Sequence, residues 1–256
     1  MIGGFALSCV IAIIAKSRRT LSTTGAIAAI VVATASSAAG WSWAWMLIAF
    51  FVSSTLLSTI GENKKRALTG DIVEKGGERD AWQVLANGGI FGVAALMSVV
   101  NPSQLWWAAG AGAIGTAIAD TWATEIGTLS DQTPISITSR QSVPTGTSGG
   151  ITTAGTLGGI AGALGIALLA ILLGWSARVA TAAIVGGIAG LLIDSILGAT
   201  LQERRWCEQC RRGTERAIHG CGTVTVHSGG IHWLSNDIVN LASSIGGALM
   251  GTLWLL

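Results

Sequence analysis

Residues 104–128, which read QLWWAAGAGAIGTAIADTWATEIGT, form the stretch that decides the fold. The run is long enough to cross a bilayer, since a spanning helix needs about 20 mostly apolar residues. It is rich in glycine and alanine, and small residues let membrane helices pack closely. Residues 110–115 match the pattern GxGxxG, but no strand precedes them, so helix packing explains these glycines better than a dinucleotide site. The segment predicts one helix of a closely packed membrane bundle.

The composition of the whole chain supports a membrane protein. Of its 256 residues, 50% are hydrophobic and 11% are charged, against about 25% charged residues in typical soluble domains. The mean hydropathy is +0.62. These values exclude a disordered chain, a disulfide-rich secreted scaffold and an ordinary soluble enzyme. The net charge of +2 gives no argument for a nucleic-acid partner. We therefore expect a single all-α domain over residues 1–256, a polytopic helix bundle in a lipid bilayer.

Hydropathy predicts eight transmembrane helices. The expected spans are 1–16, 21–39, 41–60, 81–100, 104–128, 151–174, 178–200 and 235–256. No basic residue precedes the first apolar run, as it would in a cleavable signal peptide, so we expect an uncleaved first span. With eight spans, 14 of the 15 Lys and Arg residues fall on one side of the membrane, and only Arg178 falls on the other. The positive-inside rule makes the basic side cytoplasmic and places both termini outside.

Two further features depend on this topology. Five tryptophans near the outer span ends favour an interfacial belt over core packing: Trp41, Trp43, Trp106, Trp107 and Trp175. The cytoplasmic loop 61–80 carries five basic and five acidic residues, which is typical of a solvated loop or surface helix. Its basic residues would alternatively meet lipid phosphates or a nucleotide.

Four acidic residues lie within apolar spans or at their cytoplasmic ends: Asp120, Glu125, Asp194 and Asp237. An ionised carboxylate at membrane depth costs on the order of 3 kcal/mol unless something pairs with it. The spans offer these acids no basic partner, whereas a divalent cation would neutralise them. Mg²⁺ is typically held by one or two carboxylates together with substrate phosphates. We predict that Asp120, Asp194 and Asp237 bind Mg²⁺, with Glu125 bound to the metal or beside it.

Residues 130–153 are rich in Ser, Thr and Gly and lead directly into the span 151–174. Glycines let backbone N–H groups surround an anion, and Arg140 could add a charge-assisted contact. The loop and the start of that span would cradle a triphosphate; the alternative is a flexible linker. It is not a Walker A loop, because no Gly-Lys-Ser/Thr follows. Two amides flank Asp237 in the first turn of the last span, where a helix N-terminus attracts anions. The predicted nucleotide-binding residues are Arg140, Thr145, Gly146, Thr147, Ser148, Gly149, Gly150, Asn236 and Asn240.

The cytoplasmic hairpin 201–234 contains Cys207-x-x-Cys210 followed by His219-x-Cys221. Structural zinc sites use four Cys or His ligands in close pairs, so these residues predict a Zn²⁺ site. A disulfide is disfavoured in the cytoplasm, which leaves free thiols or redox chemistry as alternatives. His227 or His232 could replace His219 or face the substrate phosphate.

Several of these segments carry a family resemblance. The segments ADTWATEIGTLS (119–130), SITSRQSVPTGTSGGITTAGT (136–156) and IDSILGATLQ (193–202), with CEQC through HSGGIHWLSNDIVN (207–240), resemble the integral-membrane phytyl-phosphate kinase family of tocopherol and phylloquinone synthesis. The resemblance extends over residues 1–256. The chain is similar, more distantly, to dolichol and phytol kinases and to CDP-diacylglycerol synthases. It departs from the synthases, which carry lysines in the loop and an Asp-Arg near the end, where this chain has Arg140 and Asn236-Asp237.

The resemblance implies a phosphotransferase of the plasma or thylakoid membrane whose active site faces the cytoplasm. It would transfer the γ-phosphoryl group of a nucleoside triphosphate, CTP being the expected donor, to phytyl phosphate and form phytyl diphosphate. Arg204 and Arg205 would hold the acceptor phosphate, although they serve equally well as positive-inside charges. The competing hypotheses are a cytidylyltransferase acting on a lipid phosphate and an ion-coupled transporter. Carriers place their sites near the midplane, whereas these acids gather at the cytoplasmic ends.

Overall fold

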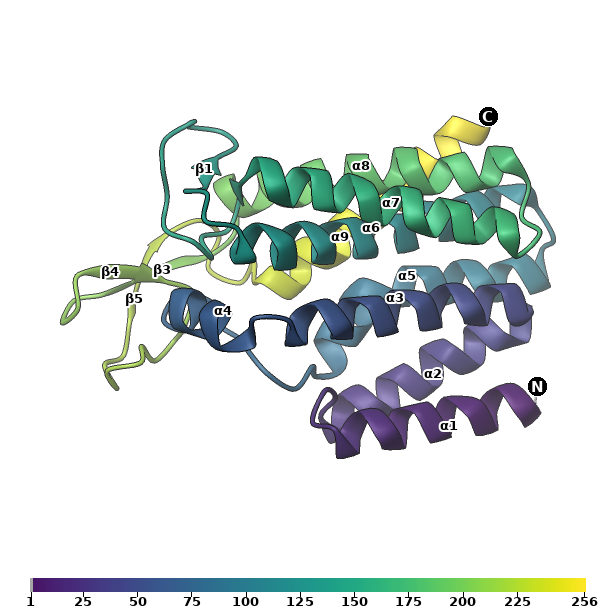
Figure 1. Cartoon of the computed structure of the whole chain (residues 1–256), viewed down its shortest axis with the longest axis horizontal. Helices are drawn as coiled ribbons and strands as arrows, with labels where there is room; N and C mark the ends of the chain where they lie inside the picture. The colour runs from purple at the N-terminus through teal and green to yellow at the C-terminus, as the bar shows by residue number, and fades with distance from the viewer. Residues whose placement is uncertain (1) are drawn as a thin grey trace.

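The computed structural model, which describes residues 2–256, is a bundle of long helices with a small group of strands at one end (Figure 1). Eight long helices follow the eight expected spans in order, which confirms the all-α fold. They are α1 (Ile2–Ser17), α2 (Thr23–Ala39), α3 (Trp41–Thr59), α5 (Ala81–Val100), α6 (Gln104–Leu129), α7 (Thr153–Leu172), α8 (Ala177–Thr200) and α9 (Asn236–Leu255). By length and hydropathy α3, α5, α7, α8 and α9 can cross a membrane, and α1 and α2 are shorter apolar helices.

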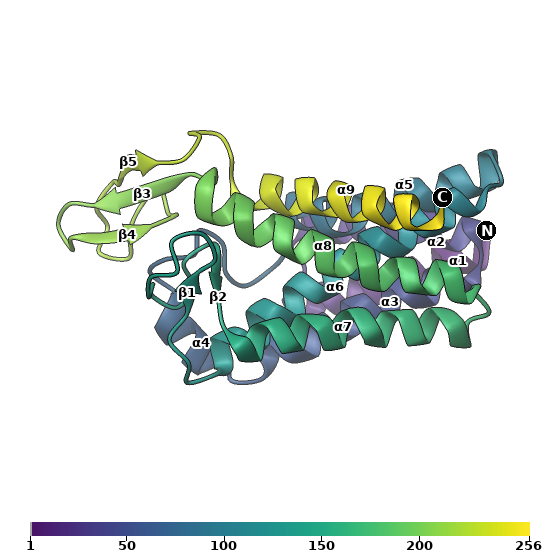
Figure 2. The same cartoon turned by 90° about the horizontal axis from the view of Figure 1, so that it is seen from above.

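The polar parts of the chain gather at one end of the bundle (Figures 1 and 2). The short helix α4 (Glu62–Thr69) lies there, and so does an antiparallel pair formed by β1 (Ile135–Ser136) and β2 (Gly150–Ile151). A three-stranded antiparallel sheet has β3 (Arg204–Cys207) between β4 (Arg212–Thr214) and β5 (Val226–Gly229). The start of α1 and the end of α9 lie at the opposite end (Figure 1). We call the end that carries α4 and the strands the polar end.

Helix α6 is the centre of the bundle and packs against α5, α7, α8 and α9. Its glycines allow very close approach, because a Cβ on Gly112 would overlap the backbone carbonyl oxygen of Gly247 on α9. A Cβ on Gly186 of α8 would meet the same oxygen. The hydroxyl of Thr116 donates to the carbonyl oxygens of Gly112 and Gly186, at 2.9 and 3.1 Å, and so joins α6 to α8. The structure thus confirms that the GxGxxG stretch is a helix-packing surface.

The tryptophan belt is only partly present. Trp43, Trp107 and Trp175 form one aromatic cluster in which Trp43 lies 4.9 Å from Trp175 and 5.2 Å from Trp107, between ring centroids. Trp43 is fully buried and Trp175 is 5% exposed, so the interfacial prediction was wrong for these two. Gly110 explains the burial, because the absence of a side chain there leaves room for the Trp43 ring. Trp41, which is 54% exposed, remains available to an interface.

The close contact at Gly112 generates a stability prediction. Gly112→Val should push α6 away from α9 and lower the free energy of unfolding by about 1–3 kcal/mol, the usual cost of overpacking. Thermal unfolding of the purified protein in detergent measures the loss. Gly165→Val on α7 is the matched control, since a Cβ there meets no atom within 4 Å. Equal effects of the two changes would contradict the proposed packing role of Gly112.

Candidate functional site

Asp120 and Asp194, on neighbouring helices, lie near one another toward the polar end. Asp194 of α8 accepts a hydrogen bond from the hydroxyl of Ser243 on α9, at 3.2 Å. Asp120 of α6 and Glu215 of the hairpin are both near enough to repel Asp194 electrostatically. The structure therefore brings together two of the three predicted metal-binding aspartates, and it adds a hairpin glutamate that sequence reasoning did not select.

Asp237 lies at the start of α9 and has a cationic partner. Its Oδ2 is 2.5 Å from the Nζ of Lys75, which also pairs with Asp80 at 2.9 Å. Burial lowers the pKa of Lys75, but its hydrogen bonds to Asp237 and Asp80 outweigh burial and raise the pKa above the ordinary value. Asp80 also caps α5 by accepting from the N–H of Gln83. The expectation that Asp237 lacks a basic partner was wrong, because the partner comes from the loop 61–80.

Glu125 is compensated in the same manner. Its carboxylate lies 2.5 Å from the Nζ of Lys65 on α4, and that lysine also donates to the carbonyl oxygen of Leu57 at 2.7 Å. The Lys65 side chain is only 10% exposed, whereas the other residues of α4 are exposed or half-buried, so α4 is the expected surface helix with one buried lysine. Within residues 2–256, Asp120 and Asp194 are the two acids of the spans that have no cationic side chain within 4.0 Å.

The Ser/Thr/Gly loop is folded, and it is not a flexible linker. The N–H of Ile137 donates to the carbonyl oxygen of Gly149, at 3.0 Å. Gly149 has φ +75° and packs so closely on Ala199 of α8 that any side chain would overlap that helix. The hydroxyl of Ser148 donates to the carboxylate of Glu215. The loop is thus held between α8 and the hairpin, whereas Arg140 remains exposed.

The N-termini of α7 and α9 differ in how many of their backbone N–H groups lack a hydrogen-bond acceptor. At the start of α7, the N–H of Gly155 donates to Thr152 and the N–H of Ala154 donates to the side chain of Gln132. At the start of α9, the side chain of Ser235 accepts no capping hydrogen bond. The α9 terminus, which carries Asn236, is therefore the freer of the two to receive an anion.

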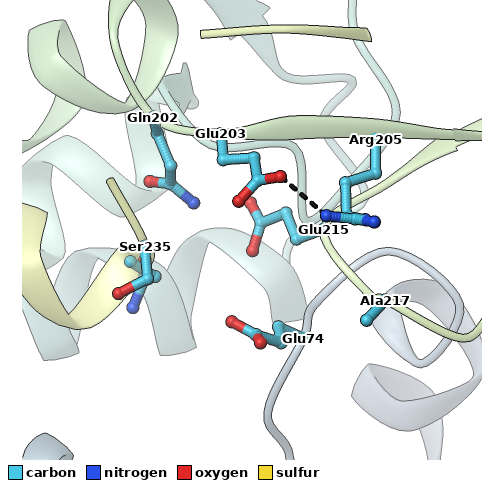
Figure 3. A pocket seen from close by; sticks show the side chains of 8 residues that line it. Glu74, Gln202, Glu203, Arg205, Glu215, Ala217 and Ser235 are labelled. Carbon is cyan, nitrogen blue, oxygen red and sulfur yellow. Dashed lines mark hydrogen bonds and ion pairs between the residues drawn. The ribbon is translucent and has the colours of Figure 1, made fainter. Parts of the chain in front are cut away.

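A small cleft of about 80 Å³ opens beside the α9 terminus, and its lining includes Ser235 and Asn236. Three carboxylates, those of Glu74, Glu203 and Glu215, line it as well, and Figure 3 shows them pointing toward a common space. Burial raises the pKa of Glu215 to about 7. These glutamates carry little signal in the sequence, because an acidic residue in a polar loop is ordinary.

The two arginines expected at the acceptor phosphate lie on β3. Arg205 donates to Glu203 at 2.7 Å and to the hydroxyl of Thr225 at 2.8 Å, so its guanidinium is engaged by the hairpin. Arg204 lies against Gly229 of β5. Their assignment to the acceptor phosphate stays a prediction.

The hairpin brings together the four expected ligands Cys207, Cys210, His219 and Cys221, whose ligand atoms all lie within 4.8 Å of one another. The Sγ atoms of Cys207 and Cys221 are 3.6 Å apart, close to the roughly 3.8 Å edge of a tetrahedron with Zn–S bonds of about 2.3 Å. Hydrogen bonding with Thr223 and His219 lowers the pKa of Cys221 to about 6, and hydrogen bonding with Cys221 raises the pKa of Cys210 to about 11, so one thiolate of this pair forms readily. The donor set can bind a metal and fits zinc.

Other candidate ligands do not join such a cluster. His227 and His232 stack on each other with ring centroids 5.5 Å apart, near Glu203. Across residues 2–256, the Cys/His group is the one place where three or more potential ligands approach within 4.8 Å. Asp120, Asp194 and Asp237 therefore do not converge on a single ion as their side chains stand, and their shared metal site stays a prediction.

The hairpin is docked on the segment that follows α4. The N–H of Glu215 donates to the carbonyl oxygen of Ile72, at 2.7 Å. Thr214 and Arg216, on either side, donate to the carbonyl oxygens of Asp71 and Gly70, also at 2.7 Å. These bonds fix the backbone around Glu215, whose carboxylate accepts from Ser148 and is near enough to Asp194 to repel it.

The bundle and its polar end define a multi-pass membrane protein with a half-buried pair of aspartates and, in its hairpin, a Cys/His cluster. Residues 6–248 match the family described as Integral membrane protein DUF92, and the chain belongs to this family. The match agrees with the integral-membrane family to which the sequence motifs pointed.

Three relatives are similar over most of their length. The chain is 31% identical to Protein PGR of Arabidopsis thaliana over 93% of this chain and 90% of the relative. It is 31% identical to an uncharacterized membrane protein of Methanocaldococcus jannaschii, covering 96% and 90% of the two chains. For an uncharacterized membrane protein of Synechocystis the identity is 28%, over 83% and 73%. No solved structure matches the chain.

The Cys/His cluster generates a metal prediction. Protein purified without oxygen should carry about one zinc per chain, and Cys207→Ser should lower that content and loosen the hairpin. Cys9→Ser on α1 is the control and should leave the zinc content unchanged. Elemental analysis and limited proteolysis of residues 201–234 check both effects. Folded, active protein that contains no zinc would contradict this assignment.

Glu215 generates a pH prediction. Its pKa in the folded protein, about 7, lies above the ordinary 4.5, so the fold favours the protonated form. The stability from this group is complete below about pH 4.5 and is lost as the pH rises through about 7. Glutamine cannot ionise, so Glu215→Gln should raise the melting temperature of the nucleotide-free protein at about pH 8 more than at about pH 5. Glu78→Gln, in an exposed position, is the control, and the same pH profile in both variants would contradict the prediction.

Proposed function

We propose that this protein is a membrane prenyl-phosphate kinase. It transfers the γ-phosphoryl group of a nucleoside triphosphate, with CTP as the expected donor, to phytyl phosphate or a related prenyl phosphate. The observation that carries the proposal is the pair Asp120 and Asp194. Both are carboxylates of membrane helices without a cationic partner, and they lie near each other beside an acidic cleft. Such a pair requires compensation, and a metal–nucleotide complex supplies it.

In this proposal Asp120 and Asp194 hold Mg²⁺ bound to the triphosphate, because Mg²⁺ commonly takes one or two carboxylates and completes its sphere with phosphates and water. Asp237 joins the site through its Oδ1, since Lys75 binds the other oxygen. The free N–H groups at the start of α9 and the side chains of Asn236 and Asn240 meet the phosphates. The loop from Thr145 to Gly150 and Arg140 cover the nucleotide from the other side.

Phosphoryl transfer mainly requires that the protein position the two substrates and neutralise the negative charge of their phosphates. An oxygen of the acceptor phosphate forms a bond to the γ-phosphorus while the bond to the β–γ bridging oxygen breaks, and the nucleoside diphosphate leaves. The attacking oxygen is already anionic, so no general base is needed. The ion pair of Lys65 with Glu125, five residues after Asp120 on α6, holds the Glu125 side chain in place.

We propose further that the polar end faces the cytoplasm and that both termini lie outside, in a plasma or thylakoid membrane. The 14-to-1 distribution of basic residues supports this orientation, and α4 and the strands lie together at one end of the bundle. The position of the acids toward that end favours an enzyme over a carrier, whose site would lie near the midplane.

The test is product analysis with nucleotides labelled at the γ-phosphate. Purified protein in nanodiscs is offered each of four nucleoside triphosphates and several prenyl monophosphates with Mg²⁺. The kinase places the label in the lipid as a diphosphate. Release of the label as pyrophosphate would indicate a cytidylyltransferase instead, and an untouched nucleotide would leave only a binding or transport role.

The three aspartates of the proposed metal site generate a prediction for both turnover and stability. Asp120→Asn and Asp194→Asn should lower turnover about 100-fold or more, because a metal clamp on the transferred phosphate is lost. The same changes should raise the thermal stability of the nucleotide-free protein, since repulsion between two half-buried acids is relieved. Asp237→Asn should also lower turnover but should lower stability, because Lys75 loses a partner.

Asp131→Asn is the control, since the Asp131 side chain is 99% exposed. Turnover is measured at limiting Mg²⁺, and stability is measured by thermal unfolding without nucleotide. Near-normal turnover of Asp120→Asn or Asp194→Asn would remove that residue from the metal site.

A further inference from the structure

A second cavity lies away from the acidic cleft, between α1, α2, α3 and α5, and holds about 110 Å³. Most of its wall is apolar, with Val32 of α2 and Leu47 and Phe51 of α3 among the lining residues. Polar residues also line it, namely Arg79 just before α5, Gln83 on α5 and Thr121 on α6. We call this cavity the α2–α5 groove. It combines an apolar wall, which can contact a lipid chain, with a cation, which can contact an anionic headgroup.

Arg79 is held rigidly at the mouth of the groove. Its N–H donates to the carbonyl oxygen of Thr20 and its own carbonyl accepts from Ser22, at 3.0 and 3.1 Å, so the turn between α1 and α2 clamps its backbone. Gly25 permits this contact, because a Cβ there would overlap the carbonyl oxygen of Arg79. The next residue, Asp80, begins the capped N-terminus of α5. A backbone fixed on both sides sets the position from which the Arg79 side chain extends.

The guanidinium of Arg79 lacks an adequate partner. Among residues 2–256 it forms no salt bridge within 4.0 Å, and its one hydrogen bond is a long one, 3.5 Å, to the hydroxyl of Thr55. Glu125 attracts it electrostatically, but the carboxylate of Glu125 is bound to Lys65. A guanidinium has five donors in a planar fork that matches a phosphate, and removal from water without such a partner is costly.

We propose that the α2–α5 groove is the acceptor site, where Arg79 binds the phosphate of a prenyl monophosphate and the apolar wall holds the first part of its chain. This inference rests on the proposed kinase function and deepens it. Thr121, which lines the groove, directly follows Asp120 on α6, so the groove and the metal–nucleotide site share this helix. The remaining chain continues into the bilayer.

The chemistry of the groove favours one class of lipid. Its mostly apolar wall receives a portion of an alkyl or prenyl chain. A monoester phosphate presents more free oxygens to the guanidinium than the diester of a phospholipid, which favours a bidentate contact. The groove therefore suits a lipid monophosphate.

The first test measures binding without nucleotide, so that it does not depend on turnover. The probe is radiolabelled geranylgeranyl monophosphate, added to purified full-length protein in phosphatidylcholine nanodiscs. Arg79→Gln should weaken binding about tenfold or more, and Arg79→Lys should weaken it less, because lysine keeps the charge but loses the fork. Arg66→Gln, an exposed arginine of α4, should leave the dissociation constant unchanged. Geranylgeraniol, which lacks the phosphate, should bind equally to wild type and Arg79→Gln.

The second test probes the apolar wall and remains decisive if Arg79→Gln fails to fold. Ala33→Phe fills the groove from α2 and should abolish saturable binding, whereas Val31→Phe on the exposed side of the same helix should not. Equal binding by both variants would overturn the groove assignment. Weakening by Arg204→Gln or Arg205→Gln but not by Arg79→Gln would move the phosphate to the hairpin and overturn it too.

The outcomes separate this inference from the proposed function. Probe binding that depends on Arg79, with no label transferred from any nucleotide, would keep the groove and reject the kinase. Turnover with an unchanged KM for the prenyl phosphate in Arg79→Gln would keep the kinase and reject the groove. Displacement of the probe by phosphatidic acid as efficiently as by unlabelled geranylgeranyl monophosphate would assign the groove to a structural phospholipid and overturn the proposal.

Discussion

Compensation of negative charge at the end of a membrane bundle is the constraint on which the rest of this structure depends. A carboxylate removed from water needs a cation near it, and the chain supplies two of its four span acids with lysines. Lys65 serves Glu125 and Lys75 serves Asp237. To reach these positions, α4 and the loop after it fold down over the polar end and form the platform on which the hairpin docks. Asp120 and Asp194 are left with their charge uncompensated.

The closeness of Asp120 and Asp194 follows from helix packing one turn away. Thr116 and Gly190 lie one turn before Asp120 and Asp194 on α6 and α8, and a Cβ on Gly190 would overlap the hydroxyl of Thr116. The same hydroxyl bonds to the carbonyl oxygen of Gly186. Small residues therefore draw the two helix backbones together just where the acids follow. Bulkier residues would separate the helices, and with them the two carboxylates.

The sequence predicts features of this protein that depend on local pattern. Apolar runs are continuous, so the eight long helices follow directly from hydropathy, and the Cys/His cluster follows from ligands spaced within fifteen residues. The lysine partners could not be found that way, because Lys65 and Glu125 are 60 positions apart and Lys75 and Asp237 are 162 apart. Nor does a tryptophan at the end of a span reveal by itself that Trp43 packs inward. Both depend on which helices become neighbours.

The segment from residue 70 to residue 80 contacts the hairpin, the start of α9 and the turn between α1 and α2. It can therefore couple binding at one of these places to binding at another. Its first residues accept hydrogen bonds from the hairpin, Lys75 bonds to Asp237, and Arg79 is clamped by the turn between α1 and α2. Anything that draws Lys75 away from Asp237 acts on a chain only four residues from Arg79. Ligands that bind at the two places would then change each other's affinity by the same factor in both directions. A short loop would in this way let a water-soluble ligand on one side and a membrane-dissolved one on the other bind cooperatively.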